Sequence, residues 1–236
     1  MDPKRRILIK LSGEYLAGKE KSGFHIPTVK KITKEIVDLV EQGIQIGIVI
    51  GGGNFYRGIN DSGNHIKRVS GDYMGMLATI INAVALKDFF ESFGQKATVM
   101  SALKVEKLSQ AVYPHHAIEL LNKGHVVIFA GGTGNPFFTT DTAGVLRAIE
   151  IEADMMLKAT RVDGVYSDDP EKNPQAVKYD KLSYREALEK GLKIMDSTAF
   201  ALAKENHLKI IVFNLNHPDA LQKIVLHHSN IGTIIE

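Results

Sequence analysis

A lysine and three consecutive glycines are the residues of this chain best suited to bind phosphate. Lys10 stands near the end of the apolar run RILIKL, and Gly51 to Gly53 directly follow the apolar run IQIGIVI. A lysine at the buried end of a strand is costly unless it meets an anion, although a lysine whose ammonium reaches solvent gives the same pattern. Consecutive glycines let backbone N–H groups approach phosphate oxygens. The alternative interpretation of the three glycines is a flexible turn without a ligand. Arg57 adds a guanidinium for charge-assisted hydrogen bonds.

The stretch GGTGNPFFTTDTAG, residues 131–144, places two phenylalanines in a loop. Loops face water, so Phe137 and Phe138 need either a core beneath them or a ligand beside them. We expect one ring against the core and one against a flat ligand. The residues Thr139–Asp141 open the next helix, where hydroxyls and backbone N–H groups bind phosphate well. Asp141 would repel phosphate unless lysines or a metal ion intervene.

Asp72, in the stretch SGDYMGM, has two interpretations. It is well placed to cap the N-terminus of the helix that follows, because aspartate oxygens accept hydrogen bonds from the first free N–H groups of a helix. A carboxylate at this position is equally able to accept hydrogen bonds from the two hydroxyls of a ribose. The residues alone do not separate these roles.

Two common nucleotide-binding motifs are approached but not matched. The stretch GEYLAGKE, residues 13–20, nearly fits the P-loop, but Glu20 replaces the hydroxyl that would hold Mg²⁺, and no helical pattern begins there. The dinucleotide pattern G-x-G-x-x-G fails because Tyr56 stands where its third glycine belongs. The phosphate-binding features therefore belong to a different kind of site.

Apolar runs rich in Ile and Val alternate with helical patterns along the chain. The patterns predict strands over 6–11, 44–50, 97–102, 125–130, 154–160, 209–213 and 232–236, and helices over 28–43, 73–94, 117–124, 142–153, 183–191, 198–207 and 218–228. Residues 161–179 are rich in Asp, Pro and Asn and are predicted to form a long loop. Near-continuous apolar strands separated by helices indicate an α/β protein whose mainly parallel sheet is covered on both faces.

Four of the predicted loops should meet in one crevice. They are KLSGE after the first strand, GGGNFYRG after the second, GGTGNPFFTTD after the fourth and KATRVDGVYSDDP after the fifth. Open parallel sheets bind ligands beyond the carboxyl ends of their strands. The regular alternation breaks near Thr160, where we expect any seam between two halves of the chain.

Composition narrows the classes of function. The chain has 236 residues, of which 44% are hydrophobic and 24% charged, and it contains no cysteine, so thiolate metal sites are excluded. A net charge of +2 with scattered basic residues gives no support for nucleic-acid binding. No apolar run approaches the roughly 20 residues of a membrane span, and we expect a cytoplasmic protein.

Together the motifs resemble those of the bacterial uridylate (UMP) kinases of the amino acid kinase superfamily. The similarity covers nearly the whole chain and is carried by ILIKLSGE, VIGGGNFYRG, GDYMGMLAT, GTGNPFFTTDTA, EIEADMMLKATRVDGVYSDDP and MDSTAFALA. This resemblance implies a three-layer αβα sandwich without a P-loop. It also implies transfer of the γ-phosphoryl group of ATP to UMP, giving UDP for RNA and CTP synthesis, with Mg²⁺ bridging the phosphates.

The resemblance also assigns site residues. It places the ATP phosphates at Lys10, Leu11, Ser12, Gly13, Gly53 and Arg57, and the nucleoside part of ATP at Thr160, Tyr166 and Asp169. It places UMP at Gly52, Asp72, Thr133, Gly134, Asn135, Pro136, Phe137, Phe138, Thr139 and Thr140. Asp141 corresponds to the aspartate that orients lysines around the transferred group, so the catalytic candidates are Lys10, Arg57 and Asp141. No protein side chain is implied as a direct metal ligand.

The family pattern further implies a homohexamer under allosteric control, built from one domain over 1–236 with an acceptor half, 1–159, and an ATP-binding half, 160–236. Residues 18–26 depart from the spacing associated with GTP activation, so the sequence leaves regulation by GTP or UTP open. Two alternatives are a superfamily kinase that phosphorylates a carboxylate or carbamate, and a non-catalytic nucleotide sensor. Asp72 and the Phe137–Phe138 loop argue against the first, because small acceptors offer no ribose and no base. Lys10 and Asp141 argue against the second.

Overall fold

The computed structural model describes residues 5–20, 22–56, 65–170, 172–192, 194–227, 229 and 231–236. Its strands are β1 (Arg6–Leu11), β2 (Gln45–Ile50), β3 (Ala97–Ser101), β4 (Gln110–Ala111), β5 (Val126–Ala130), β6 (Met155–Thr160), β7 (Val165–Tyr166), β8 (Lys178–Tyr179), β9 (Lys181–Leu182), β10 (Lys209–Asn214) and β11 (Gly232–Ile235). Its helices are α1 (Gly13–Ala17), α2 (Ile26–Glu41), α4 (Arg68–Ser92), α5 (Pro114–Asn122), α6 (Thr140–Glu150), α7 (Tyr184–Glu189), α8 (Ser197–Glu205) and α9 (Ala220–Val225).

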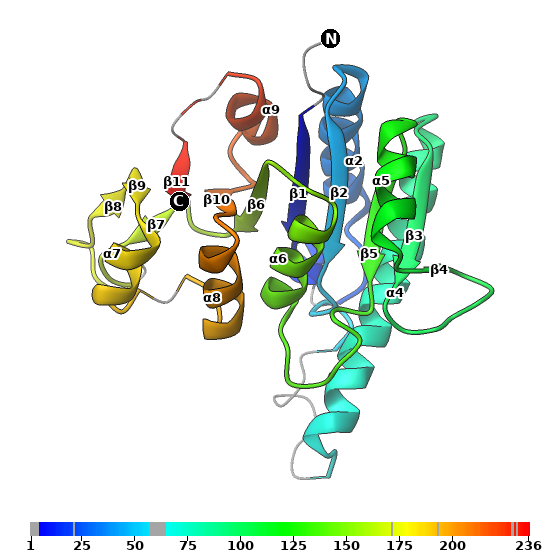
Figure 1. Ribbon diagram of the computed structural model, residues 1–236, viewed down its shortest axis with the longest axis horizontal. Helices are drawn as coiled ribbons and strands as arrows, with labels where there is room; N and C mark the ends of the chain where they lie inside the picture. The colour runs from blue at the N-terminus through cyan, green and yellow to red at the C-terminus, as the bar shows by residue number, and fades with distance from the viewer. Residues whose placement is uncertain are drawn as a thin grey trace.

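One mainly parallel sheet organises the molecule (Figure 1). Its nine strands lie in the order β4-β3-β5-β2-β1-β6-β10-β11-β9, and β7 pairs with β8 in a separate two-stranded sheet. Only the β10–β11 pair of the large sheet is antiparallel. The inner strand β2 is buried along its whole length, in agreement with its apolar sequence after Gln45.

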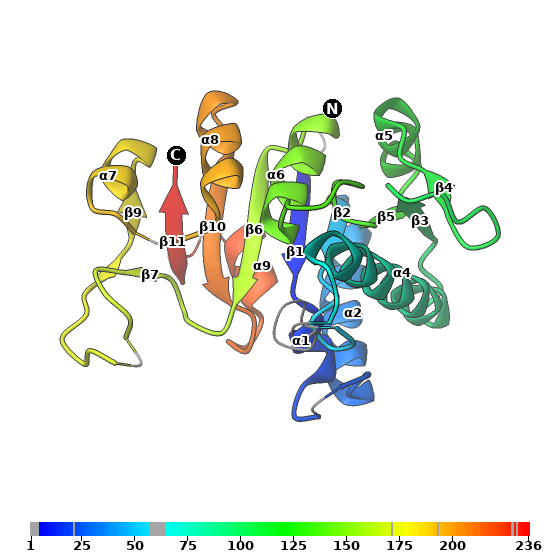
Figure 2. The same cartoon turned by 90° about the horizontal axis from the view of Figure 1, so that it is seen from below.

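Helices cover both faces of the sheet, so the protein has three layers (Figure 2). The alternation along β1 assigns the faces: Ile7 and Ile9 join the core beneath α1, α2, α4 and α9, whereas Leu8 joins the core beneath α5, α6, α7 and α8. The predicted α/β class and three-layer αβα sandwich are therefore confirmed.

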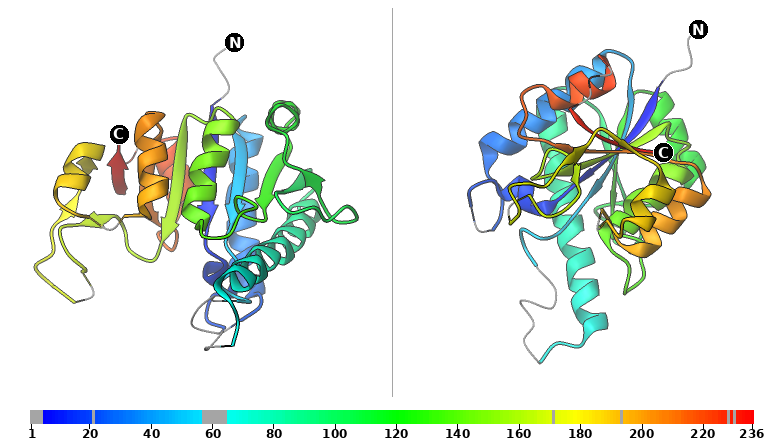
Figure 3. Two further views of the ribbon diagram at one scale, coloured as in Figure 1. Left: turned by 60° about the horizontal axis from the view of Figure 1, so that its bottom comes forward. Right: turned by 90° about the vertical axis from the view of Figure 1, so that its left-hand side faces the viewer.

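The longest helix, α4, is 25 residues long and has the length and composition of a membrane span, contrary to the sequence-based expectation that no such stretch exists. In the fold, α4 packs on β3, β5, β2 and α2, and 44% of its most apolar window is buried. The helix projects beyond the sheet at one end (Figure 3). Its apolar composition is accounted for in part by this packing.

Three local expectations were wrong. The helix α4 begins at Arg68 and not after Asp72, so Gly71 lies inside the helix. A side chain at that position would meet Tyr56, since an added Cβ would come 2.9 Å from the Tyr56 hydroxyl. A short helix, α1, does follow β1, and the Ser12 side chain caps it by accepting a hydrogen bond from the Tyr15 N–H. The predicted loop over 161–179 contains the β7–β8 pair.

Candidate active site

The loops that follow β1, β2, β5 and β6 lie at the same edge of the sheet. These strands are consecutive neighbours in the order β5-β2-β1-β6 and are all parallel, so their carboxyl ends point in the same direction. In Figure 1 the loop after β5 hangs below the sheet beside the projecting part of α4. The expected convergence of the four loops is thus a consequence of strand order.

Two lysines on neighbouring strands face one aspartate at this edge. Lys10 of β1 pairs in register with Lys158 of β6, and both side chains lie on the sheet face covered by α6. The Lys10 ammonium is 3.0 Å from Asp141 Oδ1, and the Lys158 ammonium donates a hydrogen bond to Asp141 Oδ2. Lys158 also donates to the Ile194 carbonyl oxygen at 2.6 Å. Lys10 is therefore part of a largely buried ion cluster, and a solvent-directed lysine is ruled out.

The electrostatics of this cluster favour the ionised carboxylate. Burial alone would raise the pKa of Asp141, but the ammonium groups of Lys10 and Lys158 outweigh it and hold that pKa below its ordinary value. Burial lowers the pKa of Lys158, and the neighbouring charge of Lys10 adds to this shift while Asp141 opposes it. The three side chains of the cluster together carry one net positive charge, and the nearby Asp196 carboxylate also interacts with Lys158.

The start of α6 is tied to a distant segment of the chain. Thr139 caps α6 by accepting hydrogen bonds from the N–H groups of Asp141 and Thr142. The hydroxyls of Thr139 and Thr142 both donate to Asp196, which also caps α8 by accepting from the Ala199 N–H. This link fixes the position of Asp141 between the two lysines.

Lys158 and Asp196 were not predicted from the sequence. Lys158 had a detectable signal, because the run MMLKAT repeats the pattern of RILIKL, with a lysine near the end of an apolar strand. The argument made for Lys10 applies equally there. Asp196 carried no such signal, since its role depends on the approach of α8 to α6, which no local pattern indicates.

The glycine loop after β2 is held against β1 by close backbone packing. A Cβ on Gly13 would come within 2.8 Å of both the Gly51 carbonyl oxygen and the Gly53 nitrogen, so only glycine fits there. The buried amides of Asn54 and Asn82 exchange two hydrogen bonds, of 2.9 and 2.7 Å. Asn82 also donates to the Gly51 carbonyl oxygen at 2.7 Å. The loop is therefore a fixed structure attached to α4, and a flexible turn is ruled out.

The loop after β5 is attached to the same helix. The Gly131 N–H donates a 2.7 Å hydrogen bond to the buried hydroxyl of Thr79. The glycine loop after β2 packs on the same part of α4, because a Cβ on Gly52 would come 2.7 Å from the Gly75 carbonyl oxygen. Thus α4 sets the spacing between the predicted ATP-phosphate loop and the predicted UMP loop.

Asp72 lies in the second turn of α4 and is not a helix cap. The N-cap position belongs to Lys67, and the Asp72 carboxylate instead faces the loop after β5. Asp72 Oδ2 accepts a 2.8 Å hydrogen bond from the Phe137 N–H. Phe137 and Phe138 are 65% and 48% exposed, so the expectation that one ring would join the core was wrong. Both rings remain available to a ligand.

The remaining predicted residues are spread along the same edge. Thr133 accepts a 3.2 Å hydrogen bond from the Asn135 N–H within the loop that also contains Gly134 and Pro136. The Thr160 hydroxyl donates to the Val162 carbonyl oxygen at 2.6 Å at the end of β6. The Tyr166 hydroxyl donates to Asp163 at 2.6 Å in β7, and Asp169 follows in the next turn. Arg57 lies outside the described residues.

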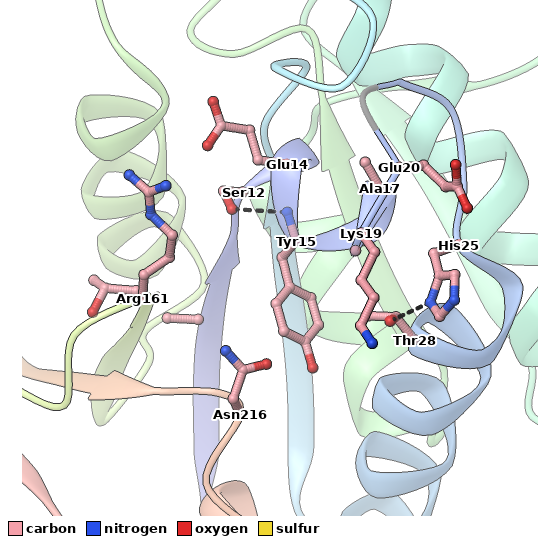
Figure 4. A pocket seen from close by; sticks show the side chains of 13 residues that line it. Ser12, Glu14, Tyr15, Ala17, Lys19, Glu20, His25, Thr28, Arg161 and Asn216 are labelled. Atoms are coloured by element: carbon pink, nitrogen blue, oxygen red, sulfur yellow. Dashed lines mark hydrogen bonds between the residues drawn. The ribbon is translucent and has the colours of Figure 1, made fainter.

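A cavity of about 450 Å³ opens beside Tyr15, which packs on the core that Ile7 and Ile9 join, whereas Lys10 lies on the other face of the sheet, near α6. Figure 4 shows the side chains that line this cavity. It lies between α1, the start of α2 and the ends of β6 and β10, with the Tyr15 ring and Asn216 pointing into it. Among the predicted ATP residues it includes Ser12 and Thr160, and it includes none of the predicted UMP residues. The cavity and the ion cluster therefore flank the end of β1 from its two sides.

Comparison with known proteins gives consistent matches over the whole chain. The model of the amino acid kinase family matches residues 5–214. A uridylate kinase of Shewanella sp. (strain ANA-3) is 51% identical over 98% of this chain and 96% of its own length. The crystal structure of UMP kinase from Bacillus anthracis superposes with a TM-score of 0.95 at 38% identity, covering 99% of this chain and 96% of that one. UMP kinase from Ureaplasma parvum gives 0.94 at 36% identity, covering 99% of both chains.

Proposed function

The chain belongs to the amino acid kinase family, and on that premise we propose that it transfers the γ-phosphoryl group of ATP to UMP, giving ADP and UDP. The observation that carries the proposal is the buried Lys10–Asp141–Lys158 cluster at the edge where the glycine loop and the Phe137–Phe138 loop meet. The names of the similar proteins, uridylate kinase and UMP kinase, support UMP as the acceptor.

The chemistry requires positioning and charge compensation more than proton transfer. The UMP phosphate is already an anionic nucleophile, so no general base is needed when its oxygen attacks the γ-phosphorus and ADP leaves. Two polyanions must come together, and Lys10 and Lys158 supply positive charge at the place where they meet. Asp141 holds both ammonium groups in place, and its own charge is compensated by them. We therefore assign Lys10 and Lys158 to the transferred group and Asp141 to their orientation.

The glycine-rich loops form the proposed ATP-phosphate site. We propose that backbone N–H groups of Ser12 and Gly13 at the end of β1, and of Gly53 in the glycine loop, bind the ATP phosphates, and that Arg57 adds a cation. Thr160, Tyr166 and Asp169 are proposed to surround the nucleoside part of ATP, and Leu11 to support the loop from the core. The cavity beside Ser12 and Thr160 offers room at the same end of the sheet.

We propose that Mg²⁺ would be held through the phosphates of bound ATP, whose negative charge it would help to neutralise. Among the described residues there is no group of three or more His, Asp or Glu side chains that could hold a metal ion. Asp141, the carboxylate closest to the proposed transfer site, is engaged by two lysines. Phosphate oxygens are ligands that Mg²⁺ commonly uses in kinases.

The proposed UMP site consists of Gly52, Asp72 and the segment from Thr133 to Thr140. Asp72 offers carboxylate oxygens to a ribose, and the exposed rings of Phe137 and Phe138 offer flat apolar surface to a base. Thr139 and Thr140 stand at the N-terminus of α6, where a phosphate is stabilised by the helix dipole. We also propose that residues 1–159 form an acceptor half and residues 160–236 an ATP-binding half, although the loops proposed for the ATP phosphates belong to the first half.

Substrate selectivity is tested by a coupled assay of ATP consumption with UMP, CMP, dUMP, carbamate and acetylglutamate presented separately. We expect the highest kcat/KM with UMP. Faster consumption with carbamate or acetylglutamate would favour the alternative superfamily kinase, and absence of turnover with every acceptor would favour a nucleotide sensor. We further propose a cytoplasmic enzyme of pyrimidine nucleotide biosynthesis that assembles as a homohexamer under allosteric control.

A further inference from the structure

Arg68 connects the two parts of the proposed UMP site. Its Nε donates hydrogen bonds to both oxygens of Asp72, at 2.8 and 3.0 Å, one helical turn away. Its guanidinium carbon lies 5.7 Å from the centre of the Phe137 ring. The Phe137 N–H completes the arrangement by donating to Asp72 Oδ2. One arginine thus contacts both the carboxylate of α4 and the ring of the loop after β5.

The position of Arg68 in the helix is unfavourable by local rules. It is the first residue of α4, follows Lys67 at the N-cap, and has no acidic residue in the first turn to compensate it. A cation at a helix N-terminus is opposed by the helix dipole. Its interactions with Asp72 and Phe137 therefore account for a side chain that helix formation alone would disfavour.

The conformation of Phe137 also needs support. Its backbone has a φ of 72°, in the left-handed region that a bulky residue seldom adopts, and its ring is exposed. The hydrogen bond to Asp72 and the contact with Arg68 are the described interactions that hold this conformation. Loss of Arg68 would leave Asp72 free to rotate and Phe137 free to relax.

We propose that Arg68 is a positioning residue of the UMP site, which orients the Asp72 carboxylate toward the ribose and holds the Phe137 loop against α4. The proposal rests on the proposed function. A carboxylate has about four acceptor positions, and the Arg68 and Phe137 hydrogen bonds occupy three of them. One position on Oδ1 remains for a ribose hydroxyl while Arg68 stays in place. Arg68 therefore assists UMP binding and does not have to be displaced by it.

The test compares Arg68→Gln and Arg68→Lys with a matched control, Lys67→Gln, which removes the same charge one residue earlier. We measure KM for UMP, KM for ATP and kcat, the dissociation constant of UMP by calorimetry, and the melting temperature. Arg68→Gln is expected to raise the KM and the dissociation constant of UMP about three- to tenfold, the effect of losing partly exposed charge-assisted hydrogen bonds. KM for ATP should stay within twofold, about the scatter of such comparisons. The KM and dissociation constant of UMP for Arg68→Lys should lie between those of the wild type and of Arg68→Gln. A lysine ammonium keeps the charge but lacks the planar, forked donor group of arginine.

A double-mutant cycle shows whether Arg68 affects UMP affinity through Asp72 or independently of it. In an Asp72→Asn background, Arg68→Gln should add little further loss of UMP affinity. A lower or unchanged dissociation constant for UMP in Arg68→Gln, an equal loss in Lys67→Gln, or full additivity with Asp72→Asn would overturn the proposal. The binding measurement does not depend on turnover: a wild-type chain that binds UMP but does not phosphorylate it contradicts only the proposed function, whereas one that binds no UMP contradicts both.

Discussion

At the scale of single residues, the proposed chemistry depends on how charge is shared among three buried side chains. Lys10 and Lys158 are like charges in register on adjacent strands, and this arrangement is stable only because Asp141 lies between them. The same carboxylate therefore stabilises the fold and prepares the site for a polyanion. Removing one lysine affects the site more than the fold, because the carboxylate keeps the other as a partner.

We predict that Lys10→Ala abolishes most catalysis without unfolding the protein. Loss of one electrostatic contact with the transferred group typically lowers kcat by about 10² to 10³. Turnover from the coupled assay and the melting temperature from calorimetry are measured on one preparation, with the exposed Lys34→Ala as control. A variant that keeps more than about a tenth of wild-type kcat, or loses activity only by failing to fold, contradicts the assignment.

Asp141 should make stability fall in acid. Its pKa is lowered in the folded state, so its contribution is fully present above its ordinary value of 3.8 and is lost as the pH falls through the lowered pKa. We predict that Asp141→Asn is destabilised at pH 7 but much less so relative to wild type near pH 2. Urea unfolding at the two pH values measures this. If Asp141→Asn lost the same free energy of unfolding at both pH values, the charge of Asp141 would not stabilise the fold.

Asp72→Asn is predicted to weaken UMP binding while KM for ATP stays nearly unchanged. The amide keeps the shape of the carboxylate but loses its charge and half of its acceptor capacity. It also presents a donor to the donors of Arg68 and Phe137. Because Asp72 does not cap α4, the helix itself should be preserved. Titration calorimetry with UMP and with ATP tests this, with the exposed Asp88→Asn on the same helix as control. Unchanged UMP affinity would remove Asp72 from the acceptor site.

At the scale of elements, α2 contains a carboxylate that its packing does not satisfy. Glu35 is buried against α1, and its Oε2 has no hydrogen-bond partner among the described residues. Burial raises the pKa of Glu35, and it raises the pKa of the neighbouring Tyr15 hydroxyl to about 12, with a further contribution from the Glu35 charge. A group with a raised pKa favours folding below its ordinary pKa, and this contribution is lost as the pH rises through the raised value.

We therefore predict that Glu35→Gln stabilises the protein at pH 8 by about 1 kcal/mol and has less effect at pH 4, because the neutral amide avoids a poorly satisfied buried charge. Melting temperatures at both values measure the difference. Glu41→Gln, an exposed change at the end of the same helix, is the control. A destabilised Glu35→Gln variant at pH 8 would indicate that Lys31, 3.9 Å away, compensates the charge.

The sequence predicted the long strands, the longer helices and the mainly parallel sheet, because apolar periodicity records which faces are buried. It did not predict the short elements α1, β4, β7, β8 and β9. The first and last residues of helices and strands were harder to predict, since they depend on contacts with residues that are distant in the sequence. The helix predicted over 73–94 begins earlier, at Arg68, and contains Gly71, where an added Cβ would come 2.9 Å from the hydroxyl of Tyr56. The carboxyl-edge loops were predicted to converge, because strand order in α/β folds is restricted. The hydrogen bonds of Asp196, Thr79 and Asn82 with distant segments of the chain were not predicted, because the sequence around each residue does not indicate its partner.

At the scale of the whole molecule, α4 has two faces with different roles. Its inner face holds both glycine-rich loops and packs on the sheet. Its outer face exposes an apolar stripe at four-residue intervals, formed by Val69, Tyr73, Leu77 and Ile81. Leu77 and Ile81 are 51% and 50% exposed, and a contiguous apolar stripe of this kind is typical of a protein contact.

We predict that the stripe is a contact between copies of the chain in the proposed homohexamer. An interface with two-fold symmetry buries the same patch on both partners, so across such an axis α4 should pack against its own copy. Light scattering at micromolar concentration should give the mass of six 26.0 kDa chains for the wild type and a smaller assembly for the double variant Leu77→Glu and Ile81→Glu. Val177→Glu, an exposed apolar side chain outside α4, should leave the mass unchanged. A wild-type mass of 26.0 kDa would reject the oligomer, and an unchanged mass in the double variant would place the contact elsewhere. Because α4 also positions Asp72, Arg68 and both loops, dissociation at this stripe should raise KM for UMP, which would connect assembly with the acceptor site.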